Sequence, residues 1–461
     1  MLHHLLPGTL AVWFALLTFS GPAAGTPASA IAPGIRQGEL ILEYDPTVSQ
    51  DTVRAWIASR GAEVLRFFRS SPHILVRFET DRSAGPEATL ARGSDLTRPK
   101  FMGHAQPNIE LDLFAGYEGP FRAGDQRYVN SDHLQHIGSF AAWEKTTGSQ
   151  EVRVAVIDTG LDYNHPDLLP NTWLNPGETG PDSQGGQRAT NGVDDDGNGF
   201  IDDFRGWDFG DGDNDPVDSF GHGTHVAGII GASGANGSGT SGVAWHVSLI
   251  GLKIMNAGRS ISLAAAVEAI DYAIDQRAHI INASWGTPAN RMAEQDQVVL
   301  RAAVERARQN GILFVTASGN YYDDNDNADS ATLPATYDLA NIISVGALAS
   351  ISRSGSGQPV APRFADYANK GRTTVHLAAP GTSIHSTWPG GTYRFQNGTS
   401  MAAPVVAGAA ALIKAYYPDA DGFEIRSRIL ENVDIPSEVD PAGIDYPVIT
   451  RGRLNVDRAL R

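Results

Sequence analysis

Short apolar runs alternate with helical patterns along the chain from about residue 150 onward. Five runs are bounded by turn residues, as buried strands are: residues 152–157, 246–252, 280–284, 312–317 and 342–346. Helical patterns lie between most of them, at residues 262–276, at residues 292–309 and from Ser400 onward. Because strand and helix alternate, the pattern predicts an α/β fold in which a mostly parallel sheet is covered by helices on both faces.

A smaller unit precedes this region, between about residues 39 and 113. Strand patterns occur at residues 39–44, 73–78 and 106–111. Between the first two, Ser49 can cap a helix that ends at Gly61, and a second helix is predicted over residues 88–96. We therefore expect a small ferredoxin-like α+β domain before the parallel sheet.

The N-terminus has the pattern of a secretory signal peptide. Residues 10–19 form an apolar stretch that is too short for a stable membrane anchor, and a run of small residues ends at the Ala-Ser-Ala of positions 28–30. The alternative, a buried core helix, is disfavoured because Pro22 and Pro27 interrupt the chain immediately afterwards. We expect residues 1–30 to be removed and the protein to be secreted, without a membrane anchor.

Composition narrows the classes of function. The 461 residues carry a net charge of −17, which argues against a nucleic-acid-binding surface and fits cation binding or plain solubility. The sequence contains no cysteine, which excludes a thiol nucleophile, a disulfide framework and a thiolate zinc site. A hydrophobic content of 41% and a charged content of 19% are typical of a globular protein.

Three residues with complementary chemistry fall at predicted strand ends or helix starts. Asp158 follows a strand, His222 opens one helix, and Ser400 heads another. These residue types make a hydroxyl nucleophilic, because the imidazole takes its proton and the carboxylate holds the imidazole in the right tautomer. Each residue also has a simpler interpretation. Asp158 could cap a turn and Ser400 its helix. His222 could pair with His225 as metal ligands on one helical face, although no H-E-x-x-H signature accompanies them.

Longer motifs surround these three residues. They are Val-Ala-Val-Ile-Asp-Thr-Gly ending at Gly160, His-Gly-Thr-His-Val-Ala-Gly from His222, and Asn-Gly-Thr-Ser-Met-Ala-Ala-Pro from Asn397. Together they resemble the active-site signatures of the subtilisin-like serine proteases, whose chain order is also Asp, His, Ser. The resemblance covers the chain from about residue 36 to the end, because the small N-terminal unit resembles the inhibitory propeptide of that family.

The resemblance implies a role for each residue. Ser400 would attack the scissile carbonyl, His222 would act as general base and then acid, and Asp158 would orient His222. The segment Thr-Ala-Ser-Gly-Asn at residues 316–320 resembles the one whose asparagine donates to the oxyanion, so Asn320 is the candidate oxyanion residue. The backbone N–H of Ser400 would be its partner. The alternative for Asn320 is a loop-forming asparagine after glycine.

Substrate-binding residues also follow from the resemblance. The candidates are Ser284, Trp285, Gly286, Gly258, Ala317, Ser318 and Gly319. The first three resemble a strand that pairs with the substrate backbone, and Gly258 with Arg259 lies where the opposing strand is expected. A peptide between two strand edges is bound through its main chain, so sequence preference comes from pockets. Small residues at Gly286 and at positions 317–319 predict a primary pocket that accepts a large apolar side chain.

Calcium (Ca²⁺) is the expected structural cofactor, because a secreted chain without disulfides needs other stabilising links. The candidate ligands are Asp167, Asn236, Asp194, Asp196, Asn198 and Asp202. The first two match calcium-ligand positions of the family. Residues 194–199 fit the D-x-D-x-N-G opening of a calcium loop, but Arg205 stands where the closing glutamate belongs, so Asp202 or Asp203 would complete the shell. The alternative is a solvated acidic insertion.

The leading hypothesis is a secreted serine endopeptidase made as a zymogen and acting on protein or peptide substrates. Its expected parts are a signal peptide (residues 1–30), a propeptide (31–118) that inhibits the enzyme intramolecularly, and a catalytic domain (119–461). Self-cleavage is expected between Leu113 and Asn130, and the chain is expected to be a monomer. A catalytically inactive binding protein on the same fold is the main alternative. An esterase of the α/β-hydrolase type is disfavoured by the triad order and the lack of a G-x-S-x-G motif.

Overall fold

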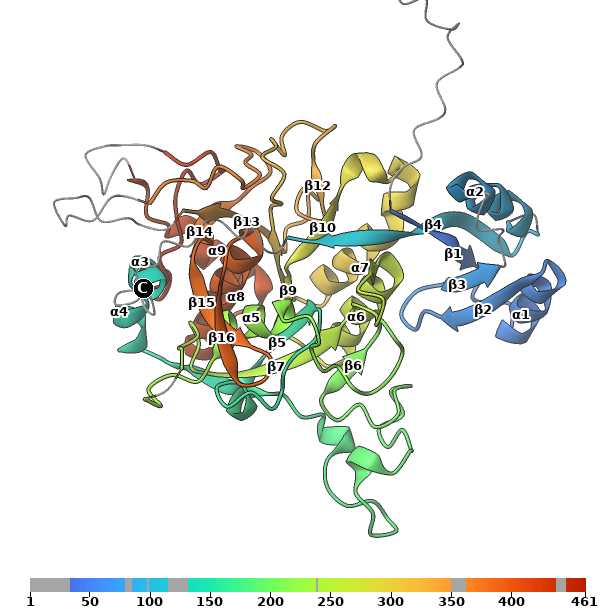
Figure 1. The fold of residues 1–461 in the computed structure, drawn as a ribbon, viewed down its shortest axis with the longest axis horizontal. Helices are drawn as coiled ribbons and strands as arrows, with labels where there is room; N and C mark the ends of the chain where they lie inside the picture. Colours follow the sequence, from blue (N-terminus) through green and yellow to red (C-terminus); the bar gives the residue numbers. More distant parts are fainter. Residues whose placement is uncertain are drawn as a thin grey trace, which may run out of the picture. The chain divides into compact units, whose positions relative to one another are not determined.

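A parallel sheet of seven strands lies at the centre of the larger part of the chain (Figure 1). Its strands are β5 (Gly148–Asp158), β6 (Gly206–Asp208), β7 (His246–Lys253), β9 (Ile280–Ala283), β11 (Leu313–Ala317), β13 (Ile342–Leu348) and β14 (Leu377–Pro380). The order is β14-β13-β11-β9-β5-β7-β6, and every neighbouring pair is parallel. The predicted α/β fold is confirmed.

The computed structural model describes residues 34–78, 85–97, 99–114, 132–237, 239–349, 362–436 and 445–461. The predicted signal peptide (residues 1–30) lies outside the described residues, and so does most of the segment in which self-cleavage was expected.

Helices cover both faces of the parallel sheet. The main ones are α5 (His222–Gly231), α6 (Leu263–Asp275), α7 (Val298–Gln309) and α8 (Thr399–Tyr416). Val154 and Val156 of β5 pack in one buried cluster with residues of α5 and α8. The residues that alternate with them, Ala155 and Ile157, pack in another cluster with residues of α6 and α7. The strand period of two therefore gives each face of the sheet its own core.

Helix α8 is long and apolar enough to cross a membrane by length and composition, but 83% of it is buried inside the protein. It is the core helix of one sheet face. Shorter helices among the described residues of this part of the chain are α3 (Asp132–His136), α4 (Ser139–Trp143), α9 (Gly422–Glu431) and α11 (Val456–Ala459). Single 3-10 turns are η1 (Leu169–Asn171), η2 (Pro176–Glu178), η3 (Arg188–Thr190), η4 (Ala289–Arg291) and η5 (Glu294–Gln297). The helix expected over residues 292–309 thus begins at Val298, after a 3-10 turn.

The N-terminal region, residues 34–114, is a small antiparallel α+β region. Its elements are β1 (Ile35–Tyr44), α1 (Gln50–Ser59), β2 (Ala62–Phe67), β3 (His73–Phe78), α2 (Gly85–Leu96) and β4 (Met102–Leu113). The strand order β4-β1-β3-β2 confirms the ferredoxin-like prediction. Ser49 caps α1 as expected, accepting the Thr52 N–H at 3.3 Å. Strand β2 was not predicted, because most of its side chains are only half-buried and its apolar pattern is weak.

The sheet of the N-terminal region continues into the larger part of the chain (Figure 1). Strand β4 pairs with β10 (Trp285–Pro288) and with β8 (Ile261–Ser262), and β10 pairs in turn with β12 (Thr332–Leu333). A separate hairpin consists of β15 (Ile384–Trp388) and β16 (Thr392–Gln396). The C-terminal half of β4 therefore pairs with strands of both parts of the chain.

Polar contacts join the same two parts of the chain beside this shared strand. Arg66 of β2 pairs with Glu268 of α6 at 2.6 Å, and His104 of β4 lies 3.1 Å from Asp296. Asn108 Oδ1 accepts the N–H of Ala264 in the first turn of α6, at 3.1 Å. That N–H has no partner within the helix, so the N-terminal region completes the hydrogen bonding of α6.

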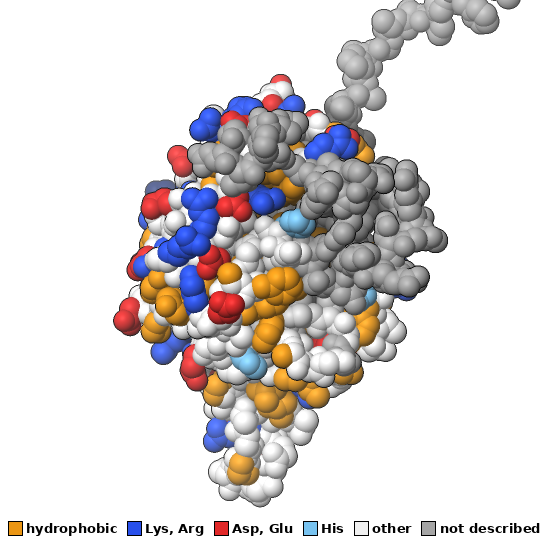
Figure 2. All heavy atoms as spheres, turned by 90° about the vertical axis from the view of Figure 1, so that its left-hand side faces the viewer, with side chains coloured by type: hydrophobic (Ala, Val, Ile, Leu, Met, Phe, Trp, Pro, Cys, Tyr) orange, Lys and Arg blue, Asp and Glu red, His pale blue; other side chains and the backbone are white. Residues whose placement is uncertain are grey.

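The surface drawn in Figure 2 mixes acidic, basic and apolar side chains. The net charge of −17 is therefore not gathered into a single acidic patch on that face.

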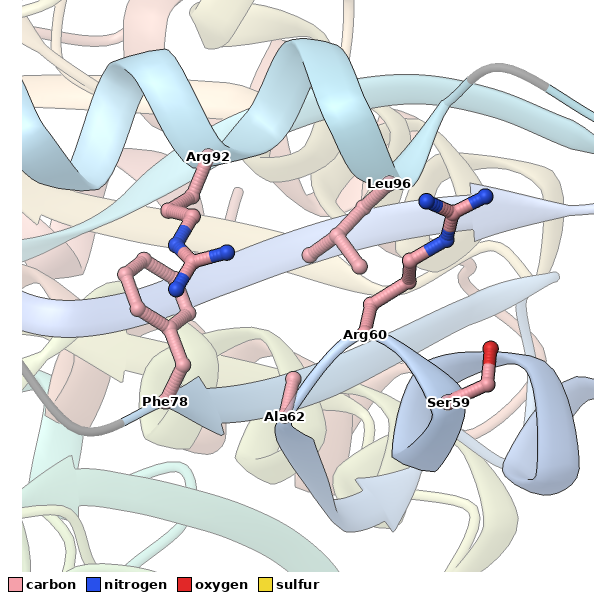
Figure 3. Close-up of a pocket in the computed structure, with 6 residues that line it drawn as sticks. All are labelled: Ser59, Arg60, Ala62, Phe78, Arg92 and Leu96. Atoms are coloured by element: carbon pink, nitrogen blue, oxygen red, sulfur yellow. The ribbon is translucent and has the colours of Figure 1, made fainter.

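A pocket of about 250 Å³ lies within the N-terminal region (Figure 3). It is lined by Ser59, Arg60, Ala62, Phe78, Arg92 and Leu96. The Ser59 hydroxyl donates to the Trp56 carbonyl at 2.6 Å, and the Arg92 guanidinium lies 5.8 Å from the centre of the Phe78 ring. None of these six described residues is a histidine or a carboxylate, so the pocket offers Ser59 no general base.

Candidate active site

Asp158 and His222 meet at the carboxyl end of the parallel sheet. Asp158 is the last residue of β5, and His222 is the first residue of α5. His222 Nδ1 lies 2.6 Å from Asp158 Oδ1, and both side chains are buried. Because the carboxylate accepts this hydrogen bond, Nδ1 carries the proton and Nε2 is left as a base. Within the described residues, Nε2 is buried without a hydrogen-bond partner.

Asp218 holds this pair in place, and the sequence did not reveal it. One carboxylate oxygen accepts from the Thr159 hydroxyl at 2.9 Å and from the Gly221 N–H at 2.8 Å. The other accepts from the N–H of Thr224 at 2.9 Å. Asp218 thus links the end of β5 to the first turn of α5. It lies three positions before the N-cap residue Gly221, too early for a capping signal.

His225, the second histidine of α5, contacts the β15–β16 hairpin. Its Nε2 lies 3.1 Å from the Ile384 carbonyl and 3.0 Å from the Arg394 carbonyl, so it donates to the backbone of the β15–β16 hairpin. One nitrogen of each imidazole is thus engaged with another group, which favours the catalytic interpretation of His222 over a histidine metal pair. Burial lowers the pKa of His225 to about 3, so it stays neutral.

Ser400 is the second residue of α8 and does not cap it. The N-cap residue is Gly398, and no side chain caps this helix. The Ser400 hydroxyl donates to the carbonyl oxygen of Ser284 at 2.9 Å, while the Ser284 hydroxyl donates to the Ser400 carbonyl at 3.0 Å. The capping interpretation of Ser400 is thus wrong, because its hydroxyl is bonded to a backbone carbonyl outside the helix.

Asn320 lies directly after the loop at the end of β11. Its Oδ1 accepts the Thr399 N–H and the Thr399 hydroxyl, both at 3.0 Å. Because a backbone N–H must face an oxygen, this contact fixes the orientation of the amide. The Nδ2 group then points the other way and donates to the carbonyl oxygen of Phe114 at 2.7 Å.

The C-terminal part of β4 lies as an extended peptide between β10 and β8, and we call the space between these two strands the groove. Its end lies close to Ser400, because the Phe114 carbonyl oxygen is next to Gly398. Leu113 pairs with Trp285 and Asp112 with Gly286, in antiparallel register. On the other side, Leu111 pairs with Ile261 of β8. The structure thus brings the predicted strand at residues 284–286 into contact with a peptide backbone.

The opposing edge lies further along the chain than expected. Gly258 and Arg259 lie in a turn before β8, and the paired residues are Ile261 and Ser262. The turn forms because Asn256 accepts two hydrogen bonds, from Arg259 N–H at its carbonyl and from Ser260 N–H at its side chain. Gly258 is therefore not part of the strand that pairs with β4.

Phe114 directly follows the last residue of β4 and is almost fully buried, at 2% exposure. Its ring packs against Gly286, where an added Cβ would come within 2.8 Å of the ring, and edge-on against Tyr321 at 5.8 Å. It belongs to the same buried cluster as Ala317.

Ser318 and Gly319, which were also predicted to line the pocket, form hydrogen bonds with neighbouring segments. Ser318 donates to the Asn369 carbonyl at 2.8 Å, and the Gly319 N–H donates to Thr399 Oγ1 at 3.2 Å. Their visible contacts are therefore made with the protein itself.

Gly398 lets the strand end close to Ser400. Its φ of 153° is rarely adopted by other residues, and an added Cβ would lie 2.5 Å from the Phe114 carbonyl oxygen. A side chain at this position would push that carbonyl away from Asn320.

An acidic group suited to a cation lies in the long loop between β5 and β6. Carboxylate oxygens of Glu178, Asp194 and Asp196 lie within 4.8 Å of one another. Glu178 is buried, and its Oε2 has no hydrogen-bond partner within the described residues. Burial raises the pKa of Glu178 to about 7, and the carboxylates of Asp203 and Asp196 act in the same direction. Three clustered carboxylates, one of which carries an unpaired oxygen, fit a hard divalent cation.

Of the ligands predicted in this loop, Asp194 and Asp196 belong to the acidic group, whereas Asn198 and Asp202 make other contacts. Asn198 donates to Asp203 Oδ2 at 2.7 Å, so both residues support the loop. Asp202 lies outside the group, because its carboxylate accepts the Gly192 N–H at 3.0 Å. Glu178 was not predicted, since it lies sixteen positions before Asp194 and belongs to no motif.

The other predicted pair, Asp167 and Asn236, does meet in the structure. Asn236 Nδ2 donates to Asp167 Oδ1 at 2.8 Å. The second oxygen, Oδ2, accepts the Thr240 N–H at 3.0 Å and the Tyr393 hydroxyl at 2.9 Å. Both carboxylate oxygens of Asp167 therefore accept from protein donors, as those of Asp194 and Asp196 also do. The acidic group differs in its three clustered carboxylates and in the unpaired Oε2 of Glu178.

Comparisons with known proteins agree with this geometry. Residues 149–455 match the sequence model of the Subtilase family of peptidases. The chain is 30% identical to a thermophilic serine proteinase of Bacillus sp. (strain AK1) over 86% of its own length and 82% of that protein. It is 37% identical to subtilisin-like protease 1 of Plasmodium vivax over 62% of its own length, but spans only 44% of that protein.

One solved structure shows the same fold. It is fervidolysin from Fervidobacterium pennivorans, described as a keratinolytic enzyme related to subtilisin. The two structures agree with a TM-score of 0.65 at 21% identity, over 93% of this chain and 61% of that one.

Proposed function

Since the chain belongs to the Subtilase family of serine peptidases, we propose that Asp158, His222 and Ser400 form its catalytic triad and that the enzyme cuts its own N-terminal region off. One observation carries this proposal. The Phe114 carbonyl oxygen accepts a hydrogen bond from Asn320 Nδ2 at 2.7 Å, in the groove next to Ser400. Such a donor accelerates hydrolysis by stabilising the oxygen that becomes an oxyanion.

The triad would work in two steps. Ser400 Oγ leaves the Ser284 carbonyl, gives its proton to His222 Nε2 and attacks the carbonyl carbon of Phe114. Asp158 accepts the Nδ1–H and stabilises the imidazolium that forms. Asn320 Nδ2 and the backbone N–H of Ser400 stabilise the oxyanion. The imidazolium then protonates the departing amine. In the second step His222 Nε2 takes a proton from water, which attacks the acyl-enzyme, and the proton is returned to Ser400 Oγ as the ester bond breaks.

Residues 34–114 would act as propeptide and inhibitor. Strand β4 fills the groove by pairing with both of its edges, so no other peptide can enter while it is bound. The polar contacts to α6 add to this pairing. The first bond to be cut would be the one that follows Phe114, which refines the expected boundary at residue 118.

We also propose that the enzyme is secreted and stabilised by calcium. The apolar N-terminal stretch supports secretion. Glu178, Asp194 and Asp196 would hold the ion, which would hold the loop between β5 and β6 in place by neutralising their charge.

Expression of the wild type and of Ser400→Ala tests the proposal. The wild type should yield a fragment that ends at Phe114, should react with a fluorophosphonate probe and should hydrolyse casein. Ser400→Ala should stay full length and do neither. Ser59→Ala, which removes a hydroxyl from the pocket of Figure 3, is the matched control and should mature normally.

Intact-mass measurement gives the cleavage site directly. Maturation of Ser400→Ala at the wild-type rate would contradict self-cleavage. A wild type that matures but neither labels nor hydrolyses casein would instead be a protease-fold binding protein.

A further inference from the structure

The contacts of β4 and Phe114 show which side chains of a bound peptide the enzyme can recognise. Pairing of Leu113 with Trp285 and of Asp112 with Gly286 uses only backbone groups, so it is indifferent to sequence. Side chains that touch the walls of the groove must therefore supply any preference.

Phe114 and Leu111 are buried against these walls. Two side chains make polar contacts: Glu110 accepts from the Ser260 hydroxyl at 2.9 Å, and Asp112 contacts both Arg291 and Tyr321.

Two donors converge on the carboxylate of Asp112. Arg291 Nη1 lies 2.6 Å from Asp112 Oδ2, and the Tyr321 hydroxyl donates to the same oxygen at 2.6 Å. Both donors belong to the wall of the groove and not to the N-terminal region. They come from separate parts of the chain, which meet only in the folded protein.

The structure holds both donors in position. Arg291 ends the turn η4 that follows β10, and this turn is closed by the Met292 N–H bonding to the Ala289 carbonyl at 3.0 Å. Tyr321 follows Asn320, and its N–H donates to Asn369 Oδ1 at 2.8 Å. The two donors are thus built into the segments that form the strand edge and the oxyanion site.

Tyr321 contacts the side chains of both Phe114 and Asp112. Its ring packs edge-on against Phe114, with ring centres 5.8 Å apart and planes at 89°, while its hydroxyl reaches Asp112. An aromatic residue at the cut bond and an acid two positions earlier are therefore recognised by one side chain.

We propose that the groove selects substrates with an acidic residue at the third position before the cut bond, through Arg291 and Tyr321. This inference rests on the proposed function, because it assumes that a substrate binds in the same position and register as β4. The substrate class is then a peptide segment of the form acid, any residue, large aromatic, cut after the aromatic residue.

The size of the preference follows from exposure. The side chains of Arg291 and Asp112 are 27% and 38% exposed, so solvent screens their attraction. The tyrosine hydroxyl adds a hydrogen bond to a charged acceptor, which is stronger than one to a neutral acceptor. We expect an acidic residue to raise kcat/KM about tenfold over its amide, and this factor to shrink at high salt.

Three peptides measure the preference. N-acetylated Leu-Asp-Leu-Phe, Leu-Asn-Leu-Phe and Leu-Lys-Leu-Phe, each carrying 7-amino-4-methylcoumarin, are hydrolysed by the purified mature enzyme, and kcat/KM is determined for each. The wild type should prefer Asp over Asn by about tenfold and Asn over Lys by less. Arg291→Gln should bring the Asp-to-Asn ratio close to one, and Arg291→Glu should reverse the order of the Asp and Lys peptides.

Two further variants separate the donors from general damage. Tyr321→Phe keeps the ring against Phe114 and should lower the Asp-to-Asn ratio only in part. Arg301→Gln, which removes an exposed arginine of α7, should leave the ratio at its wild-type value.

Equal hydrolysis of the Asp and Asn peptides by the wild type would overturn the inference and leave the proposed function intact. An unchanged ratio in Arg291→Gln would do the same. If the wild type cut none of the peptides and did not react with a fluorophosphonate, the proposed function itself would fail, and the inference with it.

Discussion

The two atoms of the Asn320 side-chain amide have different roles. The oxygen accepts hydrogen bonds that orient the side chain, and the nitrogen would donate to the oxyanion. The oxygen is held by two bonds from Thr399, which directs the nitrogen at the Phe114 carbonyl. The donor is thus oriented before a substrate arrives, so little reorganisation is needed when charge develops on the oxygen.

Replacement of Asn320 by Ala should lower kcat and leave KM almost unchanged, because the lost bond strengthens only in the transition state. The expected loss is about 10²- to 10³-fold, a range carried over from subtilisin, which is the reference case for this donor. Steady-state kinetics with the Leu-Asp-Leu-Phe coumarin peptide measure it. Asn310→Ala changes an exposed asparagine at the C-terminal end of α7 and is the control. A kcat within twofold of the wild type would contradict the role of Asn320.

Sequence reasoning found the residues that belong to local motifs and missed those that act across the fold. Asp158, His222, Ser400 and Asn320 each lie in a run of several matching residues. Arg291 has no such surroundings, because its partner Asp112 lies 179 positions away. A contact of this range leaves no periodic or local pattern, so only the folded chain reveals it.

At the scale of elements, the strands of the parallel sheet that were predicted are β5, β7, β9, β11 and β13. They are apolar on both faces, and their runs stand out. The strands β6 and β14 of the same sheet were missed, because they have only three and four residues. Strand β2 is half-buried and was missed, while β8 and β12 have two residues each, too few to form a pattern. Pairing with β4 stabilises β8, and pairing with β10 stabilises β12.

The loop between β5 and β6 is an element whose stability should depend on a metal ion. In Ser400→Ala, which avoids self-digestion, EDTA should lower the melting temperature by several degrees and added Ca²⁺ should restore it. The reason is that three clustered carboxylates repel one another when no cation balances them.

Glu178→Gln should make the melting temperature much less sensitive to EDTA, because it removes the buried ligand. Glu151→Gln changes an exposed carboxylate of β5 and should behave as its parent. Differential scanning calorimetry with and without EDTA measures both. Equal melting temperatures of the parent under the two conditions would show that the acidic loop needs no ion.

At the scale of the whole molecule, buried histidines should make the fold sensitive to acid. Burial lowers the pKa of His225 to about 3, whereas in the unfolded chain it titrates near 6.5. Below pH 6.5 the unfolded state therefore binds a proton that the folded state does not, and stability falls as the pH falls. At pH 5 this costs about 2 kcal/mol for His225.

A pair of variants isolates this effect. Burial raises the pKa of Glu268 to about 7, which stabilises the fold on acidification and opposes the histidine. Absolute melting temperatures therefore mix the two. In a Ser400→Ala background, His225→Gln should lose less stability between pH 7.5 and pH 5 than its parent. His246→Gln, at an exposed position, should match the parent. Equal losses in the His225 variant and its parent would contradict the prediction.

The two edges that hold β4 have a consequence for what the enzyme can digest. Pairing with β8 and β10 requires that residues 110–114 of the bound chain be fully extended, with their backbone groups unpaired elsewhere. In a folded target most such groups are already bonded, so a segment must first open locally. The cost of opening ranges from almost nothing at chain ends and loops to the full unfolding free energy in a core.

Each additional 1.4 kcal/mol or so of opening cost would slow cleavage about tenfold, when opening and closing are fast. Two targets with the same residues around the cut bond would then be degraded at rates set by their own local stability. The cleavage rate of a target protein would thus depend on its local conformational fluctuations as well as on its sequence.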